Sequence, residues 1–358
     1  MTHYLHQVSL KDGLSGIMRM KNEAQFVAGC IDSCIDALDE LIVVYNDCTD
    51  ETPAIVEQKR KQYPDKIKIY PYNHHILATN LSKEELDYVM SLPEDSPILF
   101  CSQCNFALSK VSYKYAMLID ADQLYFADEI KKWRDVCAKT VKVKWRLNLF
   151  LGWGFTLYIS LYRRLSTVFH RPCLFLIPDK IVSMFAGIYH DYAKMLLLEK
   201  KACIALCGLN VFKDVDWFVP FDGINVHPPY NGAGDHVIFP LTEQTYFLRR
   251  KDEQAKQSTY AVMEQFHCPY KMFFAGLFWF HLHANRPYCW GKEKAMKEEH
   301  PDFFVPLNTF LTMSYKDIHN KMDKITHPLF QRTLFAVAHK VGIGALIKHK
   351  TLLFKESK

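Results

Sequence analysis

The chain has 358 residues, of which 49% are hydrophobic and 23% charged, and its formal net charge is +5. This composition is that of a folded globular protein of one or two domains, and it excludes a disordered or collagen-like chain. The positive charge is local, because residues 325–358 contain six Lys or Arg and one acid and so account for the whole net charge. A charge confined to one segment argues against a surface that binds nucleic acid, and it indicates a segment with a role of its own.

The eleven cysteines are irregularly spaced, and only Cys101 and Cys104 form a C-x-x-C pair. Because there is no second pair at zinc-ribbon distance, we expect reduced thiols in a reducing compartment. The first residues lack the basic and apolar regions of a secretory signal, and no stretch reaches the ~20 apolar residues that span a bilayer. These features together predict a cytoplasmic protein.

The first 125 residues read as an alternation of strands and helices. Four short apolar runs predict strands, at residues 16–20, 41–45, 66–70 and 115–119. Apolar residues at helical spacing predict helices at 23–39 and 53–63. This alternation predicts an α/β fold with a mainly parallel, doubly wound sheet. Ligands bind such sheets where loops leave the carboxyl ends of strands, and polar clusters follow Tyr45 and Ile119 at those ends.

The rest of the chain is less regular. Residues 73–99 are too long for a plain connector and predict an inserted helix and loop. Residues 126–240 alternate apolar runs with Pro- and Gly-containing loops, and from Thr242 onwards the pattern favours an aromatic-rich helical region. We therefore predict a catalytic domain over residues 1–240 and a helical C-terminal extension over residues 241–358.

Two apolar segments flanked by polar sequence allow two interpretations. They are Leu147–Tyr162, which lies between clusters of Lys and Arg, and the aromatic-rich Met272–Leu282. One interpretation is packing in the core or between domains. The other is a surface at the depth of lipid headgroups, where aromatic side chains and flanking cations settle.

Two carboxylates, Asp120 and Asp122, directly follow the strand predicted at 115–119. Carboxylates at the end of a buried strand are costly unless a positive charge compensates them. Mg²⁺ and Mn²⁺ prefer oxygen ligands and share their coordination between carboxylates and phosphate. The D-x-D pattern therefore predicts a metal that bridges the protein to a diphosphate, and the alternative is a loop-capping pair without a metal.

Four segments carry a resemblance to a known family. They are LSGIMRMKNE (14–23), LIVVYNDCTDET (41–52), NFAL (105–108) and LIDADQ (118–123). In this order and spacing they resemble family-2 type glycosyltransferases of the GT-A fold, of the kind that builds bacterial surface polysaccharides. The resemblance covers about residues 13–128. It implies a Rossmann-like domain, a nucleotide-sugar donor that is most commonly UDP-linked, and Mn²⁺ or Mg²⁺ as cofactor.

The resemblance also implies roles for single residues. Asn22 and Glu23 match a pair that lines the nucleoside pocket, and Asn105 matches an Asn that contacts the nucleotide. Asp122 would coordinate the metal. Asp120 would approach the ribose or a water of the metal, and we count it as a second candidate ligand.

The sequence departs from the family pattern in two places. Cys104 stands where the family usually has Arg, so a familiar cation is missing. Tyr45 and Asn46 occupy positions where acids often read the base, and Asp47 follows one residue later. We keep Asn46 and Asp47 as candidate nucleotide-binding residues.

An inverting transferase needs a general base that takes the proton of the acceptor hydroxyl. In the family this base is a carboxylate well after the D-x-D pair, and the candidates are Asp214, Asp216, Asp222 and Asp235. We favour Asp235, because it follows a stretch that we read as a Gly-rich turn and precedes an apolar run. Asp222 is the second choice. The alternative role for Asp235 is that of a cap.

His281 and His283 end an apolar run that reads as a helix. Residues two positions apart do not share a helix face, so the two cannot both bind one metal from a regular helix, although one could from a loop or strand. Some metal-dependent GT-A enzymes use a late His as a ligand, and His281 is the better candidate. The alternative is a buried histidine packed on aromatic rings.

The basic tail at 325–358 interleaves apolar residues with its cations. Anionic lipid attracts such segments, and the alternative is a C-terminal helix packed on the protein. By family usage the acceptor would be a lipid-linked saccharide at the inner face of the plasma membrane. The sequence thus predicts a metal-dependent, inverting glycosyltransferase of the hexosyltransferase type. Two rivals are a degenerate GT-A-like binding protein at the membrane and a sugar-1-phosphate nucleotidyltransferase, although the latter's Gly-rich loop is absent after the first strand.

Overall fold

The computed structural model describes residues 9–141, 147–169, 179–221, 229–252, 259–322 and 329–355. The chain forms two compact units. The first comprises Met1–Ala121, Cys137–Lys139 and Ile238–Lys271, and the second comprises Asp122–Val136, Thr140–Val237 and Met272–Lys358. The domain boundary at residue 240 stays a prediction.

The first unit is built on four parallel strands, whose order in the sheet is β3-β2-β1-β4. These strands are β1 (Lys11–Met20), β2 (Glu40–Tyr45), β3 (Ile67–Pro71) and β4 (Tyr113–Ile119). They are the four strands expected from the apolar runs, and β1 and β2 are buried along most of their length, as apolar strands of a parallel sheet should be. The structure confirms the predicted α/β class and the mainly parallel sheet.

Helices and a hairpin complete the first unit. The helices are α1 (Val27–Cys34), the short 3-10 helix η1 (Ile35–Ala37), α2 (Thr52–Gln62), α3 (Lys83–Ser91) and α4 (Phe100–Leu108), and the hairpin strands are β10 (Tyr246–Asp252) and β11 (Ala261–His267). Helix α3 is the inserted helix expected between residues 73 and 99. It begins at Ser82, whose side chain accepts a hydrogen bond from the Glu85 amide while the Glu85 carboxylate accepts one from the Ser82 amide.

The second unit contains strands in the order β9-β6-β12-β5. They are β5 (Gln123–Tyr125), β6 (Ala202–Asn210), β9 (Tyr230–Pro240) and β12 (Lys271–His281), and the last residues of β9 belong to the first unit, where they pair antiparallel with β4. A smaller sheet has the order β13-β8-β7 and consists of β7 (Phe212–Lys213), β8 (Trp217–Pro220) and β13 (Phe304–Pro306). Gly208 on β6 is required by packing, because a Cβ atom there would lie 2.1 Å from the Trp279 ring.

One prediction about this part of the chain was wrong. The sequence favoured helix from Thr242 onwards, yet the next described elements are the strands β10, β11 and β12. The aromatic run in Met272–Leu282 forms the buried strand β12, with Leu277, Trp279 and Phe280 almost fully covered. Aromatic residues favour strands as much as buried helices, and a short apolar run does not separate the two by its periodicity. The interpretation of this segment as core packing is therefore correct for the second unit.

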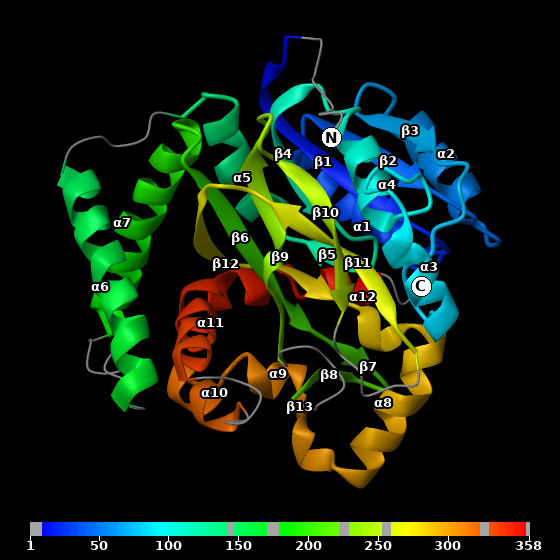
Figure 1. The fold of residues 1–358 in the computed structure, drawn as a ribbon. Coiled ribbons are helices and arrows are strands. Elements are labelled where there is room, and N and C mark those ends of the chain that lie inside the picture. Colours follow the sequence, from blue (N-terminus) through cyan, green and yellow to red (C-terminus); the bar gives the residue numbers. More distant parts are fainter. Residues whose placement is uncertain are drawn as a thin grey trace. The chain divides into compact units, whose positions relative to one another are not determined.

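The helices of the second unit follow in chain order. They are α5 (Ala127–Cys137), α6 (Leu147–Phe169), α7 (Asp179–Leu198), η3 (His283–Asn285), α8 (Pro287–Glu299), η4 (Pro301–Phe303), α9 (Leu307–Phe310), α10 (Tyr315–Lys321), α11 (Leu329–His349) and α12 (Leu352–Lys355). Helices α6 and α7 pack side by side as a hairpin (Figure 1). Within the part of the chain that the structure describes, no helix is both long enough and apolar enough to cross a bilayer.

Much of the basic tail is helix α11, which packs within the second unit. Its Arg332 and Phe335 are buried, and the Thr333 hydroxyl lies 3.0 Å from the Tyr162 hydroxyl of α6. Lys348 contacts Asp128 of α5 at 2.5 Å. The cations of the tail are thus partly engaged inside the protein, which agrees with the alternative of a packed helix.

Candidate functional site

The D-x-D pair occupies the short connection between β4, which ends at Ile119, and β5, which begins at Gln123. Asp120 belongs to the first unit and Asp122 to the second. Asp122 is 4% exposed, and its backbone carbonyl accepts a hydrogen bond from the Leu282 amide at 2.8 Å. This bond continues the antiparallel pairing of β5 with β12, in which Gln123 lies opposite His281. The end of β12 is therefore held against Asp122.

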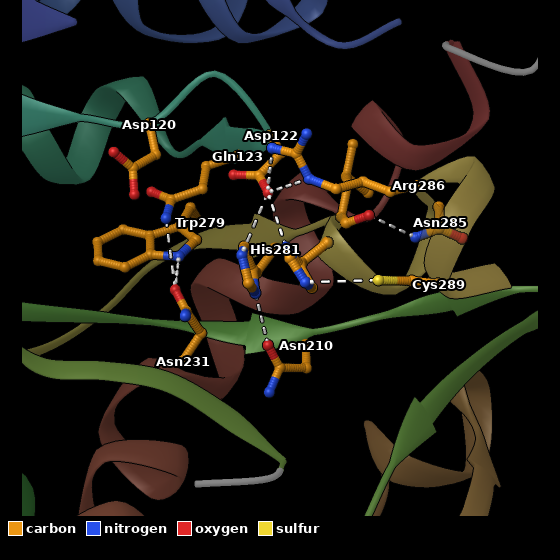
Figure 2. Close-up of polar contacts among 12 residues, drawn as sticks. Asp120, Asp122, Gln123, Asn210, Asn231, Trp279, His281, Asn285, Arg286 and Cys289 are labelled. Carbon is orange, nitrogen blue, oxygen red and sulfur yellow. Dashed lines mark hydrogen bonds and ion pairs between the residues drawn. The ribbon is translucent and has the colours of Figure 1, made fainter. Parts of the chain in front are cut away.

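Asp122, His281 and His283 form a cluster that could hold a metal ion. One Asp122 carboxylate oxygen, Oδ2, lies 3.6 Å from Nε2 of His281 and 3.5 Å from Nδ1 of His283. The three ligand atoms all lie within 4.8 Å of one another, and Figure 2 shows Asp122 and His281 facing each other. Two imidazole nitrogens and a carboxylate oxygen suit a divalent transition metal.

His283 is a ligand candidate that the sequence interpretation rejected as a partner of His281. The rejection rested on reading residues 272–282 as a helix, whereas His281 ends strand β12 and His283 begins η3. The backbone turns at Leu282, whose φ and ψ are −101° and 8°, so neither helix nor strand geometry relates the two side chains. No local signal in the sequence indicates this turn.

Arg286 binds Oδ2 of Asp122, the oxygen that also faces the two histidines. Its Nη2 and Nε lie 2.9 Å and 3.2 Å from Oδ2 of Asp122 (Figure 2). Burial alone would raise the pKa of Asp122, but His281, His283 and Arg286 outweigh burial and hold this pKa well below its usual range. Asp122 is therefore an anion at neutral pH, as a metal ligand must be.

The tautomer of His281 is set by Asn210, the last residue of β6. Nδ1 of His281 lies 2.7 Å from the Asn210 side-chain oxygen, while the Asn210 side-chain nitrogen donates to the Tyr230 carbonyl at 3.3 Å. The amide oxygen can only accept, so Nδ1 donates to it, and Nε2 is the ring nitrogen on the side of Asp122. This is the usual arrangement of a metal-binding histidine and its supporting residue.

We expect Asn210→Ala to weaken Mn²⁺ binding by roughly 10- to 100-fold, the usual cost of removing such a supporting residue. Isothermal titration of the purified chain with Mn²⁺ measures this change. Asn148→Ala, which removes an amide bonded to Asp191 in α7, is the matched control and should bind Mn²⁺ as wild type does. An unchanged affinity in Asn210→Ala would show that Asn210 does not orient a ligand.

A buried polar network continues from the cluster. Nε2 of Gln123 lies 2.9 Å from Nε2 of His236. It also lies 3.4 Å from the Asn231 side-chain oxygen, which accepts a bond from the Trp279 indole at 3.1 Å (Figure 2). His236 and Asn231 belong to β9, the strand that also contains Asp235. Strand β9 is thus tied to the residue next to Asp122.

The structure describes the preferred base candidates only in part. Asp235 lies within β9, and the stretch read as a Gly-rich turn is part of that strand, so the turn was predicted wrongly. The side chain of Asp235 and the whole of Asp222 lie outside the described residues. Of the other two candidates, Asp214 is bound by Lys297 at 2.7 Å and Asp216 is exposed. The choice of Asp235 and then Asp222 stays a prediction.

In the first unit, the guanidinium of Arg19 on β1 collects three partners. It lies 2.8 Å from the Cys104 sulfur and 2.6 Å from a Glu264 carboxylate oxygen, and 3.7 Å from Asp120. Burial would lower the pKa of Arg19, but these neighbours raise it well above its usual value, so Arg19 stays charged. A cation therefore lies beside Cys104, but it comes from strand β1 and not from helix α4.

The residues matched to the nucleoside pocket converge on the loop after β2. The Asn22 side-chain oxygen accepts a bond from the Thr49 amide at 2.8 Å, and the Glu23 amide donates to the Thr52 hydroxyl at 2.7 Å. Asp50 accepts bonds from the Ala24 and Thr52 amides, each at 3.0 Å, and so ties this loop to the end of β1.

The other predicted nucleotide-binding residues have protein partners of their own. The Asn46 oxygen accepts a bond from Gln103 at 3.0 Å. Asp47 contacts His75 at 2.6 Å, and this hydrogen bond lowers the pKa of Asp47. Asn105 bonds both backbone groups of Phe247 on β10, at 2.8 Å and 2.9 Å. Asp120, the second predicted metal ligand, is not part of the cluster with the histidines. Their roles toward a nucleotide or a metal stay predictions.

One protein-family model matches part of the chain. Residues 11–141 match the model of the family described as beta-1,4-N-acetylgalactosaminyltransferase (CgtA). A search of curated protein sequences found no match.

Solved structures share only part of their length with this chain. Glucosyl-3-phosphoglycerate synthase from Mycobacterium tuberculosis, solved with Mn²⁺, UDP and phosphoglyceric acid, is 19% identical over 32% of this chain and 34% of its own, with a TM-score of 0.20. S. aureus TarS 1-349, solved with UDP, is 17% identical over 36% of this chain and 32% of its own, with a TM-score of 0.24. The chain thus spans about a third of the length of these proteins. The family match agrees with the resemblance that the motifs carry: residues 11–141 are similar to a family of glycosyltransferases.

Proposed function

We propose that this protein is a metal-dependent glycosyltransferase that moves a sugar from a UDP-linked donor to a saccharide acceptor. The observation that carries the proposal is the cluster of Asp122, His281 and His283, which lies immediately after the D-x-D strand of a domain that matches a glycosyltransferase family. A structural D-x-D pair would have no need of two histidines gathered on one carboxylate.

The residues of the cluster fit Mn²⁺ better than Mg²⁺. Mg²⁺ strongly favours oxygen ligands, whereas imidazole nitrogen suits the later divalent ions. One carboxylate oxygen and two imidazoles leave coordination positions for diphosphate oxygens. A bound metal would neutralise the negative charge that develops on the leaving diphosphate.

Arg286 has a second part in this proposal. Its guanidinium now pairs with the oxygen of Asp122 that faces the histidines, at 2.9 Å. A metal ion held by Asp122 would repel the Arg286 guanidinium. The guanidinium would then be available to bind diphosphate oxygens, which it can do in a bidentate way.

We assign the nucleoside of the donor to the first unit. Asn22 and Glu23 would line the nucleoside pocket, and Asn46, Asp47 and Asn105 would contact the nucleotide. Asp120 would approach the ribose. The support for Asn22, Glu23, Asn105 and Asp120 is their match to the family motifs, and hydrogen bonds join Asn22 and Glu23 to the loop after β2. Asn46 and Asp47 depart from the motif and are assigned because they begin that loop.

We assign the general base to Asp235, with Asp222 as the second choice. In an inverting transfer the acceptor hydroxyl oxygen bonds to the anomeric carbon as the bond from that carbon to the diphosphate oxygen breaks. The hydroxyl proton passes to the carboxylate, and the electron pair of the broken bond stays with the diphosphate. Support for Asp235 comes from β9, whose His236 contacts the neighbour of Asp122.

We infer that the acceptor is a lipid-linked saccharide of a surface polysaccharide and that the enzyme works in the cytoplasm at an anionic membrane. The family resemblance and the charge of residues 325–358 support this inference. Because Arg332 is buried and Lys348 is paired, only part of the tail's charge is available for lipid.

A panel of nucleotide sugars, assayed for donor hydrolysis with and without Mn²⁺, tests the proposed function. We expect hydrolysis of a UDP-sugar that requires Mn²⁺ and is lost with chelator. Metal-independent binding without any hydrolysis or transfer would favour the degenerate binding protein instead. Release of pyrophosphate from a sugar phosphate and a nucleoside triphosphate would favour the nucleotidyltransferase.

A further inference from the structure

Helix α6 exposes a long apolar face. Eight large apolar side chains of this helix are exposed, and Phe150, Val168 and Leu161 are each more than half exposed, at 70%, 68% and 55%. The eight are Phe150, Leu151, Trp153, Leu157, Tyr158, Leu161, Leu165 and Val168. Monomeric soluble proteins rarely leave so many neighbouring apolar groups in water.

These side chains form one stripe. Phe150, Trp153, Leu157, Leu161 and Leu165 recur at intervals of three or four residues, which places them on one side of a helix about 35 Å long.

The opposite side of α6 is closed by α7. A Cβ atom at Gly152 would lie 2.4 Å from Cβ of Tyr192, and the rings of Phe155 and Phe185 stack with centroids 5.0 Å apart. Helix α7 adds two exposed apolar residues, Ile181 and Met184, to the hairpin. The stripe is thus the outer face of a tightly packed pair of helices.

The charged residues of helix α6 are all cations, whereas α7 contributes the acids Asp179 and Asp191. Residues 140–178 contain six Lys or Arg and no Asp or Glu. Arg163 and Arg164 are both exposed on α6, and with Ser160 and Val168 they line a hollow of about 540 Å³. An apolar stripe with cations beside it complements an anionic lipid bilayer, whose acyl chains are apolar and whose headgroups are anionic.

A second copy of the chain fits this face less well. Two such faces packed together would bring their arginines close without an acid on residues 140–178 to neutralise them. Exposed Trp and Tyr side chains, present here as Trp153 and Tyr158, are typical of the headgroup region of a bilayer.

We propose that the α6–α7 hairpin docks the second unit on an anionic membrane. Helix α6 lies in the plane of the headgroups, its stripe faces the acyl chains, and Arg163 and Arg164 bind lipid phosphates. This contact is separate from the basic tail, and it does not depend on the proposed transferase activity.

Vesicle flotation of the full chain tests this proposal. The vesicles are phosphatidylcholine alone or phosphatidylcholine mixed with phosphatidylglycerol. We expect the wild type to float with the mixed vesicles only. The double variant Leu157→Asp/Leu161→Asp should bind at least tenfold more weakly, and Arg163→Ala/Arg164→Ala should lose about fivefold per arginine at low salt. Val215→Asp changes an apolar residue of the second unit that is 88% exposed but lies outside α6, and it should float as wild type does.

Circular dichroism and a thermal melt establish that each variant is folded. As a second measurement, brominated lipids should quench the tryptophan emission of wild type more than that of Trp153→Phe. A wild type that never floats would overturn the proposal, and so would a Leu157→Asp/Leu161→Asp variant that floats normally. Light scattering that shows a dimer dissociated by Leu161→Asp, with no flotation, would assign the face to a second copy instead.

Discussion

Asp122→Ala should abolish Mn²⁺ binding and sugar transfer together. Asp122 is the single anion of the cluster, and its Oδ2 lies within 3.6 Å of both histidines. Its removal leaves Arg286 beside two imidazoles, an arrangement that repels a cation. We expect Mn²⁺ affinity to fall by more than the roughly 100-fold that the loss of a supporting residue can cost. Isothermal titration with Mn²⁺ and UDP-sugar hydrolysis measure the two losses.

Two other carboxylates serve as comparisons for Asp122. Asp128 pairs with Lys348 and His349 and has no part in the cluster, so Asp128→Ala should bind Mn²⁺ as wild type does. Asp120→Ala should keep the binding of free Mn²⁺ and lose affinity for the donor, because Asp120 is outside the cluster. If Asp122→Ala binds Mn²⁺ normally, the metal site lies elsewhere. If it transfers sugar at the wild-type rate, the chemistry does not need this metal.

The parallel sheet of the first unit was predictable because its strands are local features of the sequence. Each of β1 to β4 is an apolar run bounded by polar residues, and the strand–helix alternation leaves few ways to join such runs. The capping pair of Ser82 and Glu85 likewise marks the start of α3 within a few residues. Local signals of this kind need no knowledge of distant partners.

The cluster itself was only half predictable. Asp122 and His281 are 159 residues apart, and they meet because β5 pairs with β12, a pairing that no local pattern encodes. The aromatic run of β12 fits a buried helix as well as a buried strand. Once the helix was chosen, the geometry of a helix excluded His283 as a partner, and this error followed from the assignment of the element rather than from the histidines.

Arg19 shows a further limit of reading motifs by position. The sequence indicated a missing cation at Cys104, and the structure places the Arg19 guanidinium 2.8 Å from that sulfur. Arg19 and Cys104 are 85 residues apart, and the pair depends on how α4 packs on β1. A substitution at one motif position can therefore be compensated by a charge that the motif does not contain.

Asp235→Asn should lose transfer while it keeps the donor. The change removes the proton acceptor but preserves the shape of the side chain, and loss of a general base costs roughly 10²- to 10⁴-fold in rate. Mn²⁺ affinity should not change, because the ligands Asp122, His281 and His283 are untouched. Single-turnover transfer to an added saccharide measures the rate, and titration with UDP measures the retained donor site.

The comparison of Asp235→Asn with two matched variants decides which carboxylate takes the proton. Asp216→Asn alters an exposed carboxylate of the second unit and should transfer sugar normally. Asp222→Asn should also transfer near the wild-type rate if Asp235 is the base, and a large loss there with normal Asp235→Asn would move the role to Asp222. Strand β9 places Asp235 close in sequence to Asn231 and His236, which are both bonded to Gln123. Gln123 is the neighbour of the cluster residue Asp122. A base on β9 would therefore share one rigid strand framework with the metal, which is the condition for holding the acceptor oxygen in line with the leaving diphosphate.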